Sequence, residues 1–183
     1  MIRVGREPAN PEEIFMRTLR PLVLVVGIPL LCSFSMAQQN AGGGDQKDRA
    51  AIAQTLERFL EAWNKNDVHA FAMTFTEDAD FTNVVGVHAH GRADVETFHA
   101  PRFATTFKGT HQTAQIRSIR FLTSSLAAVD VDWQLTGSKY QDGSPRPDRK
   151  GLINCVMARQ ADGSWLFEVL HNTDLTNPPS ATK

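Results

Sequence analysis

The apolar residues between positions 48 and 63 recur at every third or fourth place, which is the spacing of one face of an α-helix. They are Ile52, Leu56, Phe59, Leu60 and Trp63, with Asp45 or Asp48 available as the N-terminal cap. Asp67 can cap a second, short helix over 68–75. A third apolar stripe, Val95 to Phe107, follows Gly91 or Asp94 and is interrupted by Pro101. The pattern predicts three helices, the first amphipathic and lying on a flat surface.

Alternation of apolar and polar residues replaces the helical spacing after position 112. It predicts strands over 113–122, 126–136, 151–160 and 165–175, and an earlier strand over 81–85. In the segment 126–136, Val129, Val131 and Trp133 share one face, while Asp130 and Asp132 take the other. Such strands are typical of an antiparallel sheet that helices cover on one side only. The order of elements predicts an α+β fold, in which a curved sheet around a helix leaves a cavity at its open end.

The N-terminal segment has the pattern of a signal peptide. Two arginines precede an apolar run over 22–31 that is too short to span a membrane, and small residues suit cleavage after Ala37. We therefore expect a signal peptide over 1–37, with Met16 as its initiator, and a secreted or periplasmic protein without a membrane anchor. The alternative is a lipoprotein acylated at Cys32, which the bulky preceding leucine disfavours.

Composition narrows the function classes. Removal of residues 1–37 takes away four arginines and three glutamates, so the formal charge moves from −1 to −2 and offers nucleic acid no basic surface. Cys155 is then left without a partner for a disulfide. The sequence has no phosphate-cradling glycine loop, so we expect no cofactor. One domain over 48–175 remains, with a flexible leader over 38–47 and a tail over 176–183.

Four segments carry a resemblance to a known family: AWNKNDVHAFAMTF, DADFTNVVG, HGRADVETFHAPRFATTFKGT and DGSWLFEVLHNT. In this order and spacing the chain resembles the SnoaL-like branch of the superfamily that includes nuclear transport factor 2 and ketosteroid isomerase. It is similar in particular to the SgcJ/EcaC-like group. The resemblance covers residues 48–175 and implies a cone-shaped fold, with a curved antiparallel sheet around helices and an internal cavity. It also implies a homodimer formed through the sheet. The superfamily includes both enzymes and scaffolds, so the fold alone implies no reaction.

Ketosteroid isomerase chemistry needs a carboxylate base, and a tyrosine and a protonated aspartate that hold the enolate oxygen. The resemblance places Asn83 at the base position, Phe59 at the tyrosine position, and the third position near Val156. An amide cannot abstract a proton at neutral pH, and a phenyl ring cannot donate a hydrogen bond. We therefore expect isomerisation by this route to be lost, while Asn83 can still orient a carbonyl or hydroxyl group.

Six histidines raise the question of other chemistry. His88 and His90 flank a single residue, so in an extended segment both rings point the same way, as in a metal site. Only His99 suggests itself as a third ligand, and a histidine pair at the pocket mouth is the alternative, so we expect no metal site. The resemblance places His99 where the third helix faces the cavity, as a pocket residue or a boundary histidine. The alternation predicts that His171 shares the inner strand face of Phe167, either entering the cavity or capping the strand end.

Three functions fit these residues. The first is a domain that binds a small hydrophobic molecule, with Asn83, His99 and His171 as polar anchors. Its apolar lining would be Trp63, Phe81, Phe98, Trp133 and Phe167. The second is an enzyme of the cyclase, hydratase or isomerase type, in which His99 and His171 form a catalytic acid/base pair. The third is a non-catalytic dimeric accessory module with a filled cavity.

Overall fold

The structure is a computed structural model that describes residues 36–140 and 142–176. Most of the expected signal peptide, residues 1–35, and the tail beyond residue 176 lie outside the described residues. Within the described part, no helix is both long enough and apolar enough to cross a membrane.

Three helices precede the long strands, as the spacing of apolar residues predicted. They are α1 (Met36–Lys65), α2 (Val68–Ala72) and α3 (Arg92–Ala104). The side chain of Asp67 caps α2 by accepting a hydrogen bond from the Ala70 amide at 2.9 Å. The helix α1 includes residues 38–47, for which the sequence analysis expected a flexible leader. Asp48 is consequently no helix cap: its carboxylate accepts from the Trp165 indole at 3.1 Å and pairs with Arg159.

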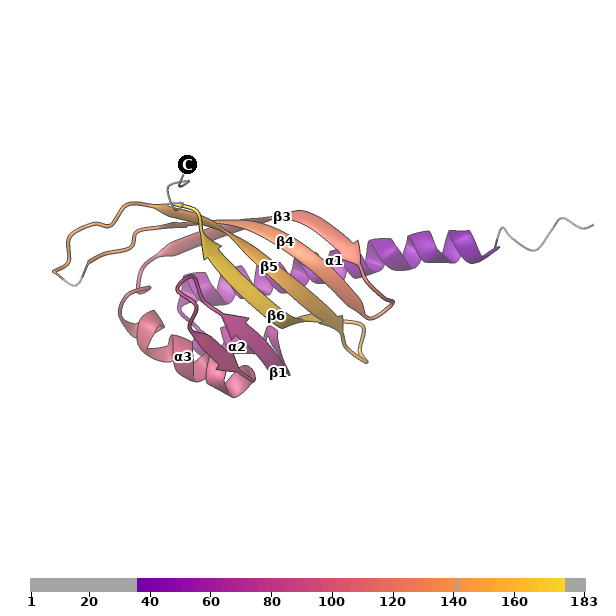
Figure 1. Ribbon diagram of the computed structural model, residues 1–183, viewed down its shortest axis with the longest axis horizontal. Coiled ribbons are helices and arrows are strands. Elements are labelled where there is room, and N and C mark those ends of the chain that lie inside the picture. Colours follow the sequence, from indigo (N-terminus) through magenta and orange to yellow (C-terminus); the bar gives the residue numbers. More distant parts are fainter. Residues whose placement is uncertain (1–35, 141, 177–183) are drawn as a thin grey trace, which may run out of the picture. The chain divides into compact units, whose positions relative to one another are not determined.

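Six strands form one sheet in the order β2-β1-β6-β5-β4-β3. Their bounds are β1 Phe75–Thr82, β2 His88–His90, β3 His111–Phe121, β4 Leu126–Thr136, β5 Arg149–Arg159 and β6 Trp165–Asp174. All neighbours are antiparallel except β1 and β6, which run parallel. The sheet is therefore mixed, because the last strand, β6, lies beside β1 and runs in the same direction. Figure 1 shows the long strands β3 to β6 curving over α1, and the α+β fold with a curved sheet around helices is confirmed.

The strand β6 contains a bulge that changes which side chains face inward. Its register against β5 moves by one residue between Phe167 and Val169, which leaves Glu168 as the extra residue. A bulge of this kind shifts the alternation of side chains by one position. Phe167 is buried before the bulge and Leu170 after it, so His171 is exposed on the opposite, outer face of the sheet. The prediction that His171 shares the face of Phe167 is therefore wrong.

The core between helices and sheet is unusually rich in phenylalanine. The Phe59 ring on α1 lies 4.7 Å from Phe71 and 5.4 Å from Phe167, measured between ring centroids. Phe75 lies 5.3 Å from Phe167 and closes this cluster. Aromatic rings at such separations add to the free energy of burial. Cys155 is also buried, which raises the pKa of its thiol to about 12 and leaves it protonated and unreactive.

Candidate functional site

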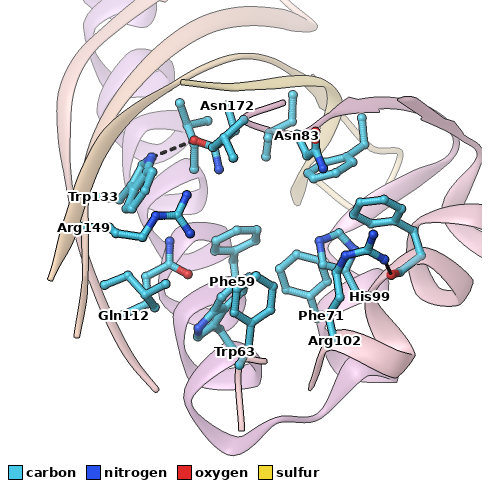
Figure 2. A pocket seen from close by; sticks show the side chains of 17 residues that line it. Phe59, Trp63, Phe71, Asn83, His99, Arg102, Gln112, Trp133, Arg149 and Asn172 are labelled. Carbon is cyan, nitrogen blue, oxygen red and sulfur yellow. Dashed lines mark hydrogen bonds between the residues drawn. The ribbon is translucent and has the colours of Figure 1, made fainter. Parts of the chain in front are cut away.

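A cavity of about 80 Å³ lies between the helices α1, α2 and α3 and the strands β1, β3, β4, β5 and β6. At about 30 Å³ per molecule, as in liquid water, this space holds on the order of three water molecules. Figure 2 shows the ring of side chains around it. The 17 lining residues are Phe59, Trp63, Phe71, Phe81, Asn83, Val84, Phe98, His99, Arg102, Phe107, Gln112, Trp133, Leu135, Arg149, Ile153, Leu170 and Asn172. Most are aromatic or aliphatic, so the cavity is an apolar container with a few polar groups.

Among the residues that the structure describes, His99 is the only histidine that lines the cavity. Its side chain is buried, with 3% of the residue exposed, and its ring lies 4.6 Å from Phe71 and 4.9 Å from Phe81 between centroids. The ring nitrogen Nδ1 lies 2.8 Å from the carbonyl oxygen of Val95, which can only accept, so Nδ1 carries the proton. Nε2 is therefore a hydrogen-bond acceptor. Burial, together with the smaller effect of the Arg102 charge, lowers the pKa of His99 to about 4 despite the Val95 hydrogen bond, which raises it, so the ring is neutral at pH 7.

Two amide side chains form the polar wall opposite His99. Trp133 Nε1 donates to Oδ1 of Asn172 at 2.7 Å, which leaves the Asn172 amide nitrogen free to donate. The side chain of Asn64 fixes the backbone of Gln112. Asn64 Oδ1 accepts a hydrogen bond from the Gln112 backbone amide at 2.7 Å, and Asn64 Nδ2 donates to the Gln112 carbonyl oxygen at 3.0 Å. Only 5% of Gln112 is exposed, and its side-chain oxygen Oε1 accepts no hydrogen bond from any described residue. A buried acceptor without a partner costs about 1–3 kcal/mol, which is unusual enough to require an explanation.

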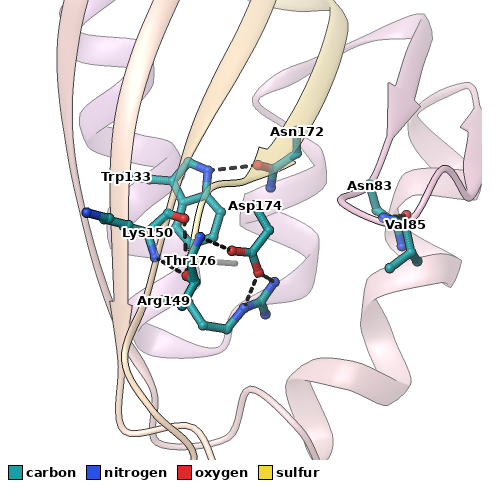
Figure 3. A network of polar contacts seen from close by, with 8 residues as sticks. All are labelled: Asn83, Val85, Trp133, Arg149, Lys150, Asn172, Asp174 and Thr176. Atoms are coloured by element: carbon teal, nitrogen blue, oxygen red, sulfur yellow. Dashed lines mark hydrogen bonds and ion pairs between the residues drawn. The ribbon is translucent and has the colours of Figure 1, made fainter. Parts of the chain in front are cut away.

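Two arginines complete the lining. The guanidinium of Arg102 lies over the Phe98 ring at 3.7 Å from its centroid. Arg149 is held from the other side, because its Nη2 and Nε pair with Asp174 at 2.6 and 2.7 Å. Figure 3 shows this network, in which Thr176 donates its backbone amide to the other oxygen of Asp174 at 2.8 Å. None of the described residues that line the cavity is Asp, Glu or Tyr, so its fixed charges are positive.

The side chain of Asn83 stabilises a turn at the rim of the cavity. Its Oδ1 accepts hydrogen bonds from the backbone amides of Val85 and Val87 at 3.0 and 2.9 Å. An asparagine that bonds the backbone ahead of it stabilises a turn, here the turn between β1 and β2 (Figure 3). The amide nitrogen of Asn83 remains for a ligand. The side-chain oxygen, which a carbonyl-orienting role could have used, is already occupied.

The cavity brings together most of the residues that the sequence nominated. Six of the eight line it: Trp63, Phe81, Phe98, Trp133, Asn83 and His99. Phe167 does not, because it packs deeper, against Phe59 and Phe75. His171 does not, because the β6 bulge turns it outward, and Asn172 takes the inward position instead. The acid/base pair of His99 and His171 is therefore not formed.

Sequence reasoning missed the remaining polar lining residues. Gln112 lies in β3, which begins two residues earlier than predicted. Asn172 follows the β6 bulge, which shifts the alternation of side chains by one residue. Arg102 and Arg149 gave no signal beyond their charge. Of the positions implied by the resemblance to ketosteroid isomerase, Phe59 and Asn83 do line the cavity. Val156 is not a lining residue, and the strand β5 contributes Ile153 instead.

Comparisons with known proteins agree with this architecture. Residues 56–166 match the model of the SnoaL-like domain. A domain of unknown function with a cystatin-like fold from Nostoc punctiforme is 29% identical, with a TM-score of 0.63 over 72% of this chain and 79% of that one. A putative scytalone dehydratase from Novosphingobium aromaticivorans is 20% identical, with a TM-score of 0.63 over 73% and 87%.

A third solved structure, a ketosteroid isomerase-like protein from Erwinia carotovora, is 15% identical, with a TM-score of 0.59 over 70% of this chain and 96% of that one. At identities of 20% and below, these likenesses show a shared fold and not a shared reaction. No curated protein matches the chain in sequence. The chain belongs to the SnoaL-like domain family, within the superfamily that shares the nuclear transport factor 2-like and ketosteroid isomerase-like fold.

Proposed function

We propose that this protein binds a small, largely apolar molecule that carries a hydroxyl group, such as a phenol, in the aromatic cavity. The observation that carries the proposal is the buried Oε1 of Gln112, which has no partner among the described residues. A ligand hydroxyl would donate to this oxygen or to Nε2 of His99, and so remove the cost of burying an unpaired acceptor. The same hydroxyl oxygen could accept from the free Asn172 amide nitrogen.

The walls and charges of the cavity support this ligand class. Phe59, Trp63, Phe71 and Phe81 present ring faces and edges to the cavity, which suits an aromatic or alicyclic ring. The two arginines and the absence of any lining carboxylate among the described residues disfavour a cationic ligand. The volume of about 80 Å³ is smaller than a cavity of roughly 150 Å³ that holds benzene, so a ligand with one ring would enter only if the rim opens.

A catalytic function has less support than binding. The enzyme hypothesis required two converging histidines, and His171 is exposed on the outer sheet face. His99 remains as the single neutral base in the cavity, with a pKa of about 4, well below the pH at which a general base is most effective. The carboxylate and tyrosine of ketosteroid isomerase have no counterpart among the described lining residues.

Replacement of Gln112 by methionine should weaken the binding of 4-nitrophenol about tenfold, the cost of one lost hydrogen bond. The change keeps the side-chain length but removes the buried acceptor. Binding can be measured by quenching of tryptophan fluorescence, because Trp63 and Trp133 both line the cavity. Gln134→Met is the matched control, since Gln134 is an exposed glutamine that does not line this cavity. Equal affinities in the two variants, or no quenching in the wild type, would contradict the proposal.

We further propose that the protein is exported and forms a homodimer through the outer face of its sheet. Export is supported by the signal-peptide pattern of residues 1–37. Dimerisation is supported by half-buried apolar side chains on the outer face, among them Leu152, Val156 and Val169. Native mass spectrometry of protein recovered from outside the cytoplasm should show two chains that begin at Gln38, and Val156→Arg should yield the single chain. A mass that includes residues 1–37, or a wild-type monomer, would count against the respective proposal.

A further inference from the structure

The hairpin of β1 and β2 places two histidines and an aspartate side by side on the outer face of the sheet. Asp80 pairs with His90, and Thr82 pairs with His88, so these four side chains share one face. Phe81 and its partner on β2 are buried on the other face, toward the core. The group therefore lies across the sheet from the cavity and is independent of the binding function proposed above.

The distances within this group are those of a metal site that needs little rearrangement. Oδ1 of Asp80 lies 2.8 Å from Nδ1 of His90 and 3.4 Å from Nε2 of His88, and the three ligand atoms all lie within 4.8 Å of one another. Ligand atoms at about 2.1 Å from a tetrahedral zinc ion lie about 3.4 Å apart. A zinc ion between the three groups would therefore require shifts of less than about 1 Å at side chains that are free to move, since all three are about half exposed or more.

The surroundings of the cluster match what a metal-binding histidine needs. The second ring nitrogen of His88, Nδ1, lies 3.4 Å from the hydroxyl of Thr82, which can orient the ring while Nε2 binds a metal. His171 belongs to the same face, because it pairs with Thr82 across β6. The bulge that removes His171 from the cavity thus adds a third imidazole beside this cluster. His99, which the sequence suggested as a third ligand, lies in the cavity on the opposite side of the sheet.

We propose that Asp80, His88 and His90 form a binding site for Zn²⁺ on the outer face of the β1–β2 hairpin. Imidazole nitrogen and carboxylate oxygen are ligands that zinc accepts together, and three protein ligands leave a fourth position open to solvent. The mixture of two imidazoles with one carboxylate favours zinc over Mg²⁺ and Ca²⁺, which prefer oxygen ligands. The alternative is that Asp80 only forms ion pairs with the two histidines, which predicts no selective affinity for zinc.

The test is isothermal titration calorimetry, in which the untagged full-length protein is titrated with ZnCl₂ alone. We expect one high-affinity zinc ion per chain, with no competition from millimolar Mg²⁺. His88→Ala and His90→Ala should each weaken zinc binding by a factor of 10 to 100. Because both residues are exposed, the variants should retain the fold, which circular dichroism can verify. The matched controls are His69→Ala and His111→Ala, which replace exposed histidines elsewhere on the chain and should leave the affinity unchanged.

Two results would overturn the proposal. One is that the wild-type protein binds no zinc, or that millimolar Mg²⁺ displaces the bound zinc. The other is an equal loss of affinity in the ligand and control variants, which would indicate adventitious binding by surface histidines. A second measurement uses Co²⁺ as a spectroscopic probe: tetrahedral coordination by the cluster should produce visible absorption bands that are absent in the His90→Ala variant. The phenol-binding assay is unaffected by either outcome, since the cavity lies across the sheet.

Discussion

Replacing Gly151 by alanine should lower the free energy of unfolding by about 3 kcal/mol, the upper part of the range for overpacking a core. A Cβ atom at this position would clash with the carbonyl oxygen of Thr173 and with Cζ2 of Trp133. Neither neighbour can yield easily. The first is the backbone of β6, and the second is an indole held by its hydrogen bond to Asn172 and packed across from Gly151 in the adjacent strand. Chemical denaturation followed by tryptophan fluorescence measures the loss.

The same substitution should also impair ligand binding, because Trp133 lines the cavity and displacement of its ring would change the cavity wall. Gly86→Ala is the control for the general cost of replacing a glycine. Gly86 has a φ of 80° and no atom within 4 Å of a built Cβ, so its replacement should cost about 1 kcal/mol through backbone strain alone. If Gly151→Ala destabilises the protein no more than Gly86→Ala does, the tight contact described here between Gly151 and Trp133 is not present in solution.

Acidification should destabilise the protein through His99 by about 3 kcal/mol between pH 6.5 and pH 4. The unfolded chain takes up a proton on this imidazole near its ordinary pKa of 6.5, whereas burial lowers the folded pKa to about 4. Within this window the unfolded state binds more protons, so stability falls as the pH falls. The contribution is complete above pH 6.5 and fully lost below the folded pKa. Each unit of difference between the two pKa values corresponds to about 1.4 kcal/mol.

The contribution of His99 can be isolated by comparing the pH dependence of unfolding in the wild type and in His99→Leu. The variant removes the titrating group, so its unfolding free energy should decline less steeply over the same pH range. His111→Leu is the matched control, because His111 is an exposed histidine at the start of β3. Its curve should run parallel to that of the wild type. Parallel curves for His99→Leu and the wild type would show instead that His99 is accessible to protons in the folded state.

The helices and most of the sheet could be predicted because their signals are local. The spacing of Ile52, Leu56 and Phe59 and the alternation of Val129 and Val131 require only the geometry of one element. All of these residues are buried on the expected face. The same reasoning placed most of the aromatic lining of the cavity correctly. The superfamily and the α+β fold were likewise identified from sequence segments and are confirmed.

The candidate sites depended on contacts that no single segment contains. The bulge at Glu168 exists because two strands pair with different numbers of residues, and it decides that Asn172 faces the cavity while His171 faces outward. The parallel pairing of β1 with β6 also depends on contacts between segments that are far apart in the sequence. The strand β2 was not predicted, because three residues are too few to show an alternation of apolar and polar side chains.

Local patterns in the amino-acid sequence were sufficient to predict the helical and extended segments, the inward faces of most strands and the family. Contacts between elements bring Asp80 next to His88 and His90, and they bury Oε1 of Gln112 without a partner among the described residues. The physical reason is that periodicity reports which side of one element is apolar, whereas a site is a set of distances between elements. Those distances follow from strand register and bulges, which are set by packing across the whole sheet.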